Sequence, residues 1–241
     1  MTDRQRLLPP ALRRPSQRQQ PGEGQDAARL LPARARMPAA LLATGCLVLV
    51  GVLGAIYAHQ GHGSAIDRAV DSWVFGLRIP LPALKLVSRI GGVPAVTLLT
   101  AVLAVACLAV RRLDGAVLAV CGVTLASALT EFVLKPLVHR TILGYLTYPS
   151  GHTTVLFALA AALAIVLLTP RSGRSHPAVR IAAVAAAVFV ASVVGLTMVG
   201  QQFHYFTDTV AGAAVGTGVV IGVAFLLDLR AARRWLRWPG R

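Results

Sequence analysis

Long uninterrupted apolar runs dominate the chain, without the alternation of half-buried strands or the narrow stripes of amphipathic surface helices. Each run has about the length that a helix needs to cross the hydrocarbon core of a bilayer, roughly 20 residues. The pattern argues against an outer-membrane barrel, whose strands alternate apolar and polar positions. It predicts six spans, at about residues 38–58, 92–110, 115–134, 152–169, 179–199 and 209–228.

The composition favours a membrane protein over a water-soluble globule. Of the 241 residues, 56% are hydrophobic and 14% are charged, and the mean hydropathy is +0.67. The formal net charge of +15 would suggest nucleic acid in a soluble protein, but aromatic residues are few and are not interleaved with the basic ones. We therefore expect no nucleic-acid partner. The predicted fold class is all-α, a polytopic membrane protein built as a six-transmembrane-helix bundle.

The segments between and around the spans define the predicted domain organisation. Residues 1–36 carry eight arginines and no sustained apolar period, which predicts a disordered basic tail. Residues 37–228 form the membrane domain, and residues 229–241 form a second basic tail. We interpret the first span as an uncleaved anchor, with a cleaved signal peptide as the alternative. Residues 64–77 have an apolar face and predict an interfacial helix, with a solvated connector as the alternative.

The distribution of basic residues predicts the orientation of the chain. The two tails and the two loops on their side hold 18 of the 24 Lys and Arg residues, and the opposite loops hold 6. By the positive-inside rule both termini are predicted to be cytoplasmic. The predicted location of the protein is the plasma membrane.

Three polar clusters interrupt the apolar chain, and the predicted topology places all three at the outer ends of spans. They cover residues 135–140, 148–153 and 204–208. In the second cluster, Ser150, Gly151 and His152 offer a hydroxyl, free backbone N–H groups and an imidazole at a helix start, which favours anion binding. A plain turn is the alternative.

The other two clusters contain titratable groups with helical spacing. His204 and Asp208 are four residues apart, so the carboxylate is able to hold one ring nitrogen protonated and leave the other free to attack. A structural hydrogen bond is the alternative. Lys135 and Arg140 are either fixed cations of the site or snorkelling side chains. Glu131 precedes Lys135 by one helical turn, which predicts a pair that positions the ammonium.

These motifs together resemble the type-2 phosphatidic acid phosphatase superfamily. The resemblance rests on residues 135–140, on the tetrapeptide Pro149-Ser150-Gly151-His152 and on His204-x3-Asp208, and it covers about residues 37–228. The tetrapeptide is the most specific part, and three motifs in the expected order and on one predicted side are far more specific than one.

The resemblance implies a role for each matching residue. His204 is similar to the nucleophile that forms a phosphohistidine, Asp208 to the carboxylate that orients it, and His152 to the general acid. A bell-shaped pH dependence near neutrality follows from this pair of histidines. No metal ion and no other cofactor are expected. The implied phosphate-binding groups are Lys135, Arg140, Ser150 and Gly151.

Two positions depart from the pattern of the superfamily. Its first motif usually ends in Arg-Pro, where this chain has Ile142-Leu143, and its third usually opens with Ser-Arg, where this chain has Thr197-Met198. Either neighbouring polar groups replace these arginines or phosphate binding is weaker. The candidate replacements are Arg140, Gln201 and Gln202.

The sequence as a whole predicts a metal-independent lipid phosphatase whose site is extracytoplasmic. Its partners are the lipid bilayer and a lipid phosphate, either undecaprenyl diphosphate or a phosphatidate-like lipid, and the residues define no oligomeric state. The alternative is a catalytically degenerate protein of the same fold that binds or carries lipid phosphate. A channel or transporter is disfavoured, because polar clusters on one side give no polar path across a membrane.

Overall fold

The structure is a computed structural model that describes residues 29–169 and 176–236, with side chains as far as residue 230. Within these ranges it contains long helices, short helical turns and one small hairpin. The elements are α2 (Ala33–Tyr57), α3 (Ala65–Gly76), α4 (Leu81–Ser88), a 3-10 turn (Arg89–Gly91), α5 (Val93–Ala109), α6 (Leu113–Leu129), a π-helical turn (Thr130–Leu134), α7 (Lys135–Val138), β1 (Thr141–Ile142), β2 (Tyr145–Leu146), α8 (Gly151–Leu168), α9 (Pro177–Gly200) and α10 (Phe206–Leu236).

Five of the described helices are long and apolar enough to cross a membrane, and a bent pair makes six. The pair comprises residues 81–91 and 93–109, which meet at an angle of 41°. The predicted all-α polytopic bundle is therefore confirmed. α2 begins at Ala33, inside the stretch predicted to be a tail, and α10 continues to Leu236. The rest of the two predicted tails, residues 1–28 and 237–241, lies outside the described residues.

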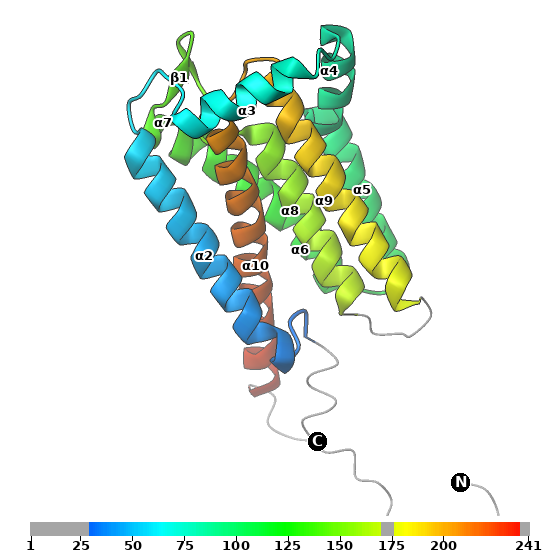
Figure 1. Ribbon diagram of the computed structural model, residues 1–241. Coiled ribbons are helices and arrows are strands. Elements are labelled where there is room, and N and C mark those ends of the chain that lie inside the picture. Colours follow the sequence, from blue (N-terminus) through cyan, green and yellow to red (C-terminus); the bar gives the residue numbers. More distant parts are fainter. Residues whose placement is uncertain (1–28, 170–175, 237–241) are drawn as a thin grey trace, which may run out of the picture.

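The spans form two unequal groups around α10. Figure 1 shows α5, α6, α8 and α9 side by side, while α2 lies on the other side of α10. Glycines allow the closest helix approach, which is typical of helices that pack in a membrane. A Cβ at Gly212 of α10 would lie 2.6 Å from the Ser150 carbonyl oxygen, and one at Gly216 would overlap the Thr154 carbonyl oxygen. Gly212 and Gly216 therefore seat α10 directly on the start of α8.

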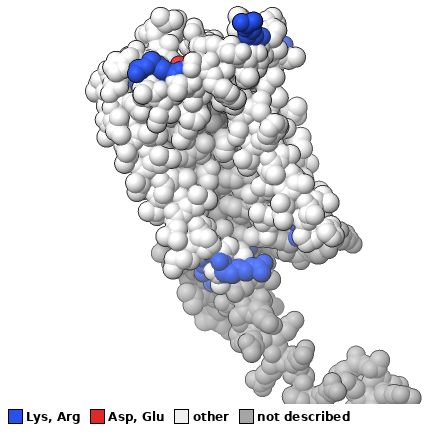
Figure 2. Space-filling view, viewed as in Figure 1, with Lys and Arg blue, Asp and Glu red and all other residues white. Residues whose placement is uncertain are grey.

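The surface of the described bundle has an apolar middle. Figure 2 shows Lys and Arg at the two ends of the molecule and an uncharged belt between them. Large side chains on this belt are more than half exposed, including Leu47 of α2, Leu98 of α5 and Phe189 of α9. Such a belt matches the hydrocarbon layer that a membrane protein contacts.

At the end where α2 starts and α10 finishes, a buried carboxylate joins the two helices. The backbone N–H groups of Leu30 and Leu31 donate to Asp228 at 2.8 and 3.0 Å, and the Arg36 guanidinium lies 3.9 Å from the same carboxylate. Leu30 and Leu31 are themselves buried. The chain just before α2 is thus fixed to α10 by a charge-assisted contact.

At the opposite end, α3 lies across the bundle (Figure 1). Its start is fixed by a capping box, in which the Ser64 hydroxyl accepts from the Asp67 N–H and the Asp67 carboxylate accepts from the Ser64 N–H. A helix in this segment was predicted and is confirmed. Of the residues on its predicted apolar face, Val74 is buried, and Ile66 and Trp73 are exposed.

Candidate active site

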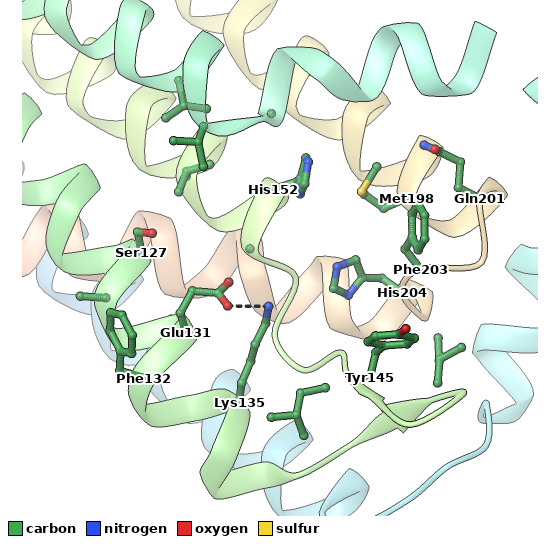
Figure 3. Close-up of a pocket in the computed structure, with 18 of the residues that line it drawn as sticks. Ser127, Glu131, Phe132, Lys135, Tyr145, His152, Met198, Gln201, Phe203 and His204 are labelled. Atoms are coloured by element: carbon green, nitrogen blue, oxygen red, sulfur yellow. Dashed lines mark hydrogen bonds and ion pairs between the residues drawn. The ribbon is translucent and has the colours of Figure 1, made fainter. Parts of the chain in front are cut away.

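The three polar clusters converge at the end of the bundle that carries α3. They surround a cavity of about 840 Å³ between α5, α6, the hairpin, α8 and the α9–α10 connection. Most of its lining is apolar. Figure 3 shows two imidazoles, an ammonium and a carboxylate around the same space. These four groups belong to His152, His204, Lys135 and Glu131.

His204 lies in the connection just before α10 and has a fixed ring orientation. Its Nδ1 lies 2.8 Å from the Thr147 carbonyl oxygen. A carbonyl only accepts hydrogen bonds, so in the neutral ring Nδ1 carries the proton and Nε2 keeps its lone pair. The Asp208 carboxylate is 4.0 Å from Nδ1 and is the more distant neighbour. The hydrogen bond to the Thr147 backbone is therefore the nearest contact that orients the ring, and Asp208, for which this role was predicted, lies further away.

The surroundings of His204 keep its imidazole neutral. Burial, and after it the positive charge of Lys135, lower its pKa to about 3, and the hydrogen bond to Thr147 only partly opposes the shift. A neutral imidazole with a free lone pair is the form that attacks an electrophile. The surroundings of His204 therefore favour the neutral imidazole, the form that its predicted role as a nucleophile requires.

His152 is the second residue of α8 and is half-buried in the cavity wall. The 3-10 turn before α5 makes room for its ring, because a Cβ at Gly91 would lie 2.9 Å from its Cδ2. The absence of a side chain at Gly91 thus leaves space for the ring of His152, which lies more than sixty positions later in the sequence. Figure 3 shows His152 and His204 as neighbours across the cavity.

A π-helical turn carries Glu131 and leads into Lys135. It ends where the Lys135 N–H bonds to the Thr130 carbonyl, and the next residue, Pro136, has no N–H to continue the pattern. Such turns are frequent at functional sites, since they alter which way side chains point. The Lys135 ammonium lies 2.8 Å from the Glu131 carboxylate, so the predicted pair is present.

Ser150 and Gly151 occupy different environments. The Ser150 side chain is fully buried, accepts a hydrogen bond from Thr153 at 3.1 Å and does not line the cavity. Its N–H donates to the Asp208 carbonyl oxygen at 3.0 Å, which joins the start of α8 to the start of α10. Gly151 does line the cavity. The structure therefore brings Gly151, but not the Ser150 hydroxyl, to the expected phosphate position.

Arg140 is not at the cavity wall, in contrast to its predicted place in the phosphate cradle. Its guanidinium is fully buried and donates to Asp208 at 2.7 Å, to Thr207 at 2.7 Å and to Asp67 at 2.8 Å. The rings of Tyr57 and Tyr205 cover its two faces, each with its centroid 4.1 Å away. These contacts leave the guanidinium no face toward a phosphate.

Asp67 is the functional-site neighbour that the sequence analysis missed. It was assigned to the polar face of an interfacial helix, but its side chain is fully buried and accepts from the N–H and hydroxyl of Thr207. Burial by itself would raise its pKa, yet hydrogen bonds from Thr207, Ser64 and Arg140 together lower the pKa of Asp67 below its ordinary value. The three-residue spacing of Ser64 and Asp67 in the sequence allows a capping box, but nothing in it points to the distant partner Arg140.

Asp208 belongs mainly to this buried network. One carboxylate oxygen accepts from Arg140, and the other accepts from the Tyr205 N–H at 3.0 Å. The carboxylate thus neutralises Arg140 and stabilises the first turn of α10. Through the Tyr205 N–H it also holds the residue that follows His204 in the chain.

The positions where the superfamily pattern has arginines are apolar and face the cavity. Ile142 and Met198, which stand at the two arginine positions, line it, and Leu143, at the neighbouring proline position, lines it as well. Gln201 and Gln202 line it as well, and the Gln201 amide donates to the Thr197 carbonyl at 3.1 Å. Among the described residues that form the lining, Lys135 is the single Lys or Arg. No group of three or more His, Cys, Asp or Glu in the described ranges is arranged to hold a metal ion.

Comparison with known proteins gives one match. Residues 138–231 match the model of a family described as the PAP2 superfamily. The match includes the motifs around His152 and His204 and begins three residues after Lys135. No curated protein and no solved structure matches the chain significantly. The resemblance seen in the motifs is thereby confirmed, and at the level of the superfamily it indicates phosphatase-type hydrolysis of lipid phosphates.

Proposed function

We propose that the chain, whose residues 138–231 match the PAP2 superfamily, is a metal-independent lipid phosphatase that works through a phosphohistidine. The observation that carries this proposal is the state of His204. Its imidazole is neutral, its Nδ1 proton is fixed by the Thr147 carbonyl, and it shares a cavity with His152 and Lys135. A nucleophile, an acid and a cation around one space are the groups that phosphoryl transfer needs without a metal.

The reaction proceeds in two steps. In the first, Nε2 of His204 attacks phosphorus, the bond from phosphorus to the leaving oxygen breaks, and His152 gives its proton to that oxygen. In the second, His152 takes a proton from water, the resulting hydroxide attacks phosphorus, and inorganic phosphate leaves with His204 restored. Lys135 and the backbone at Gly151 stabilise the charge on the phosphoryl oxygens.

The cavity lining and the bundle point to a lipid substrate. The walls around the four polar groups are mainly apolar, and the exterior of the bundle is an uncharged belt. A phosphomonoester or diphosphate whose tail stays in hydrocarbon fits such a site better than a soluble nucleotide or sugar. The proposed substrates are undecaprenyl diphosphate or a phosphatidate-like lipid.

The orientation in the membrane follows from the basic residues. The start of α2 and the end of α10 lie at the end opposite the cavity (Figure 1). The positive-inside rule makes that end cytoplasmic, so the site opens outside the cytoplasm, at the plasma membrane. We retain the predicted division into a membrane domain, residues 37–228, and two basic tails as part of this proposal.

The decisive experiment measures phosphate release by the purified full chain in detergent with EDTA present. Undecaprenyl diphosphate and phosphatidate are tested side by side, with His204→Ala and the matched control His62→Ala, an exposed histidine outside the cavity lining. We expect release from one lipid, a trapped acid-labile phosphoryl label on the wild type, and loss of both in His204→Ala alone. Release that persists in His204→Ala would overturn the mechanism.

A second candidate function is binding of lipid phosphate without turnover. It is favoured by the apolar Ile142 and Met198 at the expected arginine positions and by the Glu131 carboxylate that neutralises Lys135. Losing bidentate guanidinium contacts weakens binding of a phosphoryl group and of its transition state. Tight lipid binding by folded protein, with neither phosphate release nor a trapped label, would establish this second function.

A further inference from the structure

The carboxylate of Glu131 occupies the space expected for a phosphoryl group. One of its oxygens lies 2.6 Å from the point where a Cβ of residue 151 would stand, so it fills the volume that Gly151 leaves open. Its other oxygen lies 2.8 Å from the Lys135 ammonium. The ammonium is itself 3.9 Å from that same Cβ point. An anion is therefore already in place between the cation and the first residue of α8.

This position follows from the local backbone rather than from chance contact of surface side chains. Glu131 is the second residue of the π-helical turn, and Lys135 follows the turn directly. Both side chains line the cavity, and Figure 3 shows the pair at its wall beside the His204 ring. The i,i+4 spacing then keeps the two charges together on one face.

The charge of the cavity makes this arrangement consequential. Among the described lining residues, Glu131 and Lys135 are the only fixed charges, and they cancel. A phosphoryl group that approaches Lys135 meets a carboxylate at the same place. Two anions a few ångströms apart repel each other, and solvent screens only part of this repulsion, since the Glu131 side chain is 43% exposed and the Lys135 side chain 16%. A phosphoryl group therefore contacts the Lys135 ammonium only after the Glu131 carboxylate has moved away from it.

We infer that Glu131 is an internal competitor of the substrate: its carboxylate holds the phosphate site in the resting protein and must be displaced for a phosphoryl group to bind. This rests on the proposed function only in taking Lys135 and Gly151 as the phosphate site. It differs from a purely supporting role, in which Glu131 holds Lys135 ready for substrate. The two roles predict opposite effects when the charge is removed.

The test is equilibrium binding of inorganic phosphate to the purified full chain in detergent, measured by titration calorimetry at fixed pH and ionic strength. Glu131→Gln removes the charge and keeps the shape, and Asp71→Asn is the matched control, a carboxylate on α3 outside the cavity lining. We expect phosphate to bind about tenfold tighter or more in Glu131→Gln, as the removal of a close like charge implies. The control variant should bind as the wild type does.

An unchanged or weaker phosphate affinity in folded Glu131→Gln would overturn the inference. It would favour the other role, in which Glu131 holds Lys135 ready for substrate. If that variant does not fold, Glu131→Ala provides the same comparison. With lipid phosphate as substrate, a competitor role predicts that Glu131→Gln lowers KM more than it changes kcat, whereas the loss of an anchor for Lys135 would raise KM in the same variant. Binding of inorganic phosphate does not require turnover, so it can be measured even in a protein that shows no His204-dependent phosphate release. The competitor role of Glu131 and the proposed phosphatase mechanism can therefore be refuted independently.

Discussion

The buried network around Arg140 makes a prediction that separates the structure from the sequence-based assignment. Arg140→Met would leave the carboxylates of Asp67 and Asp208 buried without their shared cation, since both lose a charge-assisted hydrogen bond of 2.7–2.8 Å. Removing one partner of a buried ion pair costs about 3–5 kcal/mol. Because two carboxylates are affected, we expect a loss in the free energy of unfolding of about 5 kcal/mol, the upper end of that range.

A double-mutant cycle tests the origin of this loss. Asp67→Asn removes one of the two stranded charges, so the double variant should lose less than the sum of the single variants, by about 2–3 kcal/mol. Unfolding is followed by circular dichroism during titration of detergent micelles with a denaturing detergent. Arg89→Met, which changes an exposed arginine at the same end of the bundle, is the control and should unfold as the wild type does.

Two results would refute this reasoning. Additive effects of Arg140→Met and Asp67→Asn would mean that the two side chains do not act as a pair. A folded Arg140→Met protein with wild-type stability and weakened phosphate binding would show that the guanidinium belongs to the phosphate cradle after all.

Two further predictions concern the pH dependence and the helix packing. Because burial and the charge of Lys135 together lower the pKa of His204 to about 3, the acid limb of kcat/KM should lie well below neutrality. Lys135→Gln removes the charge that contributes to this shift and should move the limb to higher pH. A wild-type limb near pH 6.5, the ordinary histidine value, would contradict the burial argument. Gly216→Ala should lower the melting temperature and activity, since its Cβ meets a carbonyl of α8, while Gly222→Ala on the same helix has open space and should change neither; equal melting temperatures for the two variants would contradict the packing.

The spans and the convergence of the polar clusters followed from the sequence for simple physical reasons. A bilayer requires long apolar helices. Because the predicted topology placed all three polar clusters at the outer ends of these helices, they were expected to lie close together. The Glu131–Lys135 pair was visible for the same reason, because helical spacing fixes such neighbours locally.

The remainder of the site depends on contacts that no local pattern encodes. Arg140 and Asp67 are separated by 73 positions, and only the folded chain shows that one neutralises the other. His204 bonds to the backbone carbonyl of Thr147. Since every residue has a backbone carbonyl, the sequence does not show which residue provides this partner. The sequence shows that position 198 is a methionine, but only the structure shows that Met198 faces the cavity.

The pairing of α2 with α10 has a consequence for the synthesis of the protein. α2 is the first of the described helices and packs mainly against the last one, and Asp228 near the end of α10 completes the contact. Chains are delivered to the membrane from the N-terminus onward, so α2 remains without its main partner until α10 has been inserted. The connection with His204 arrives at the same time. Docking of the first span and completion of the cavity are thus one late event, and a chain released early would lack both.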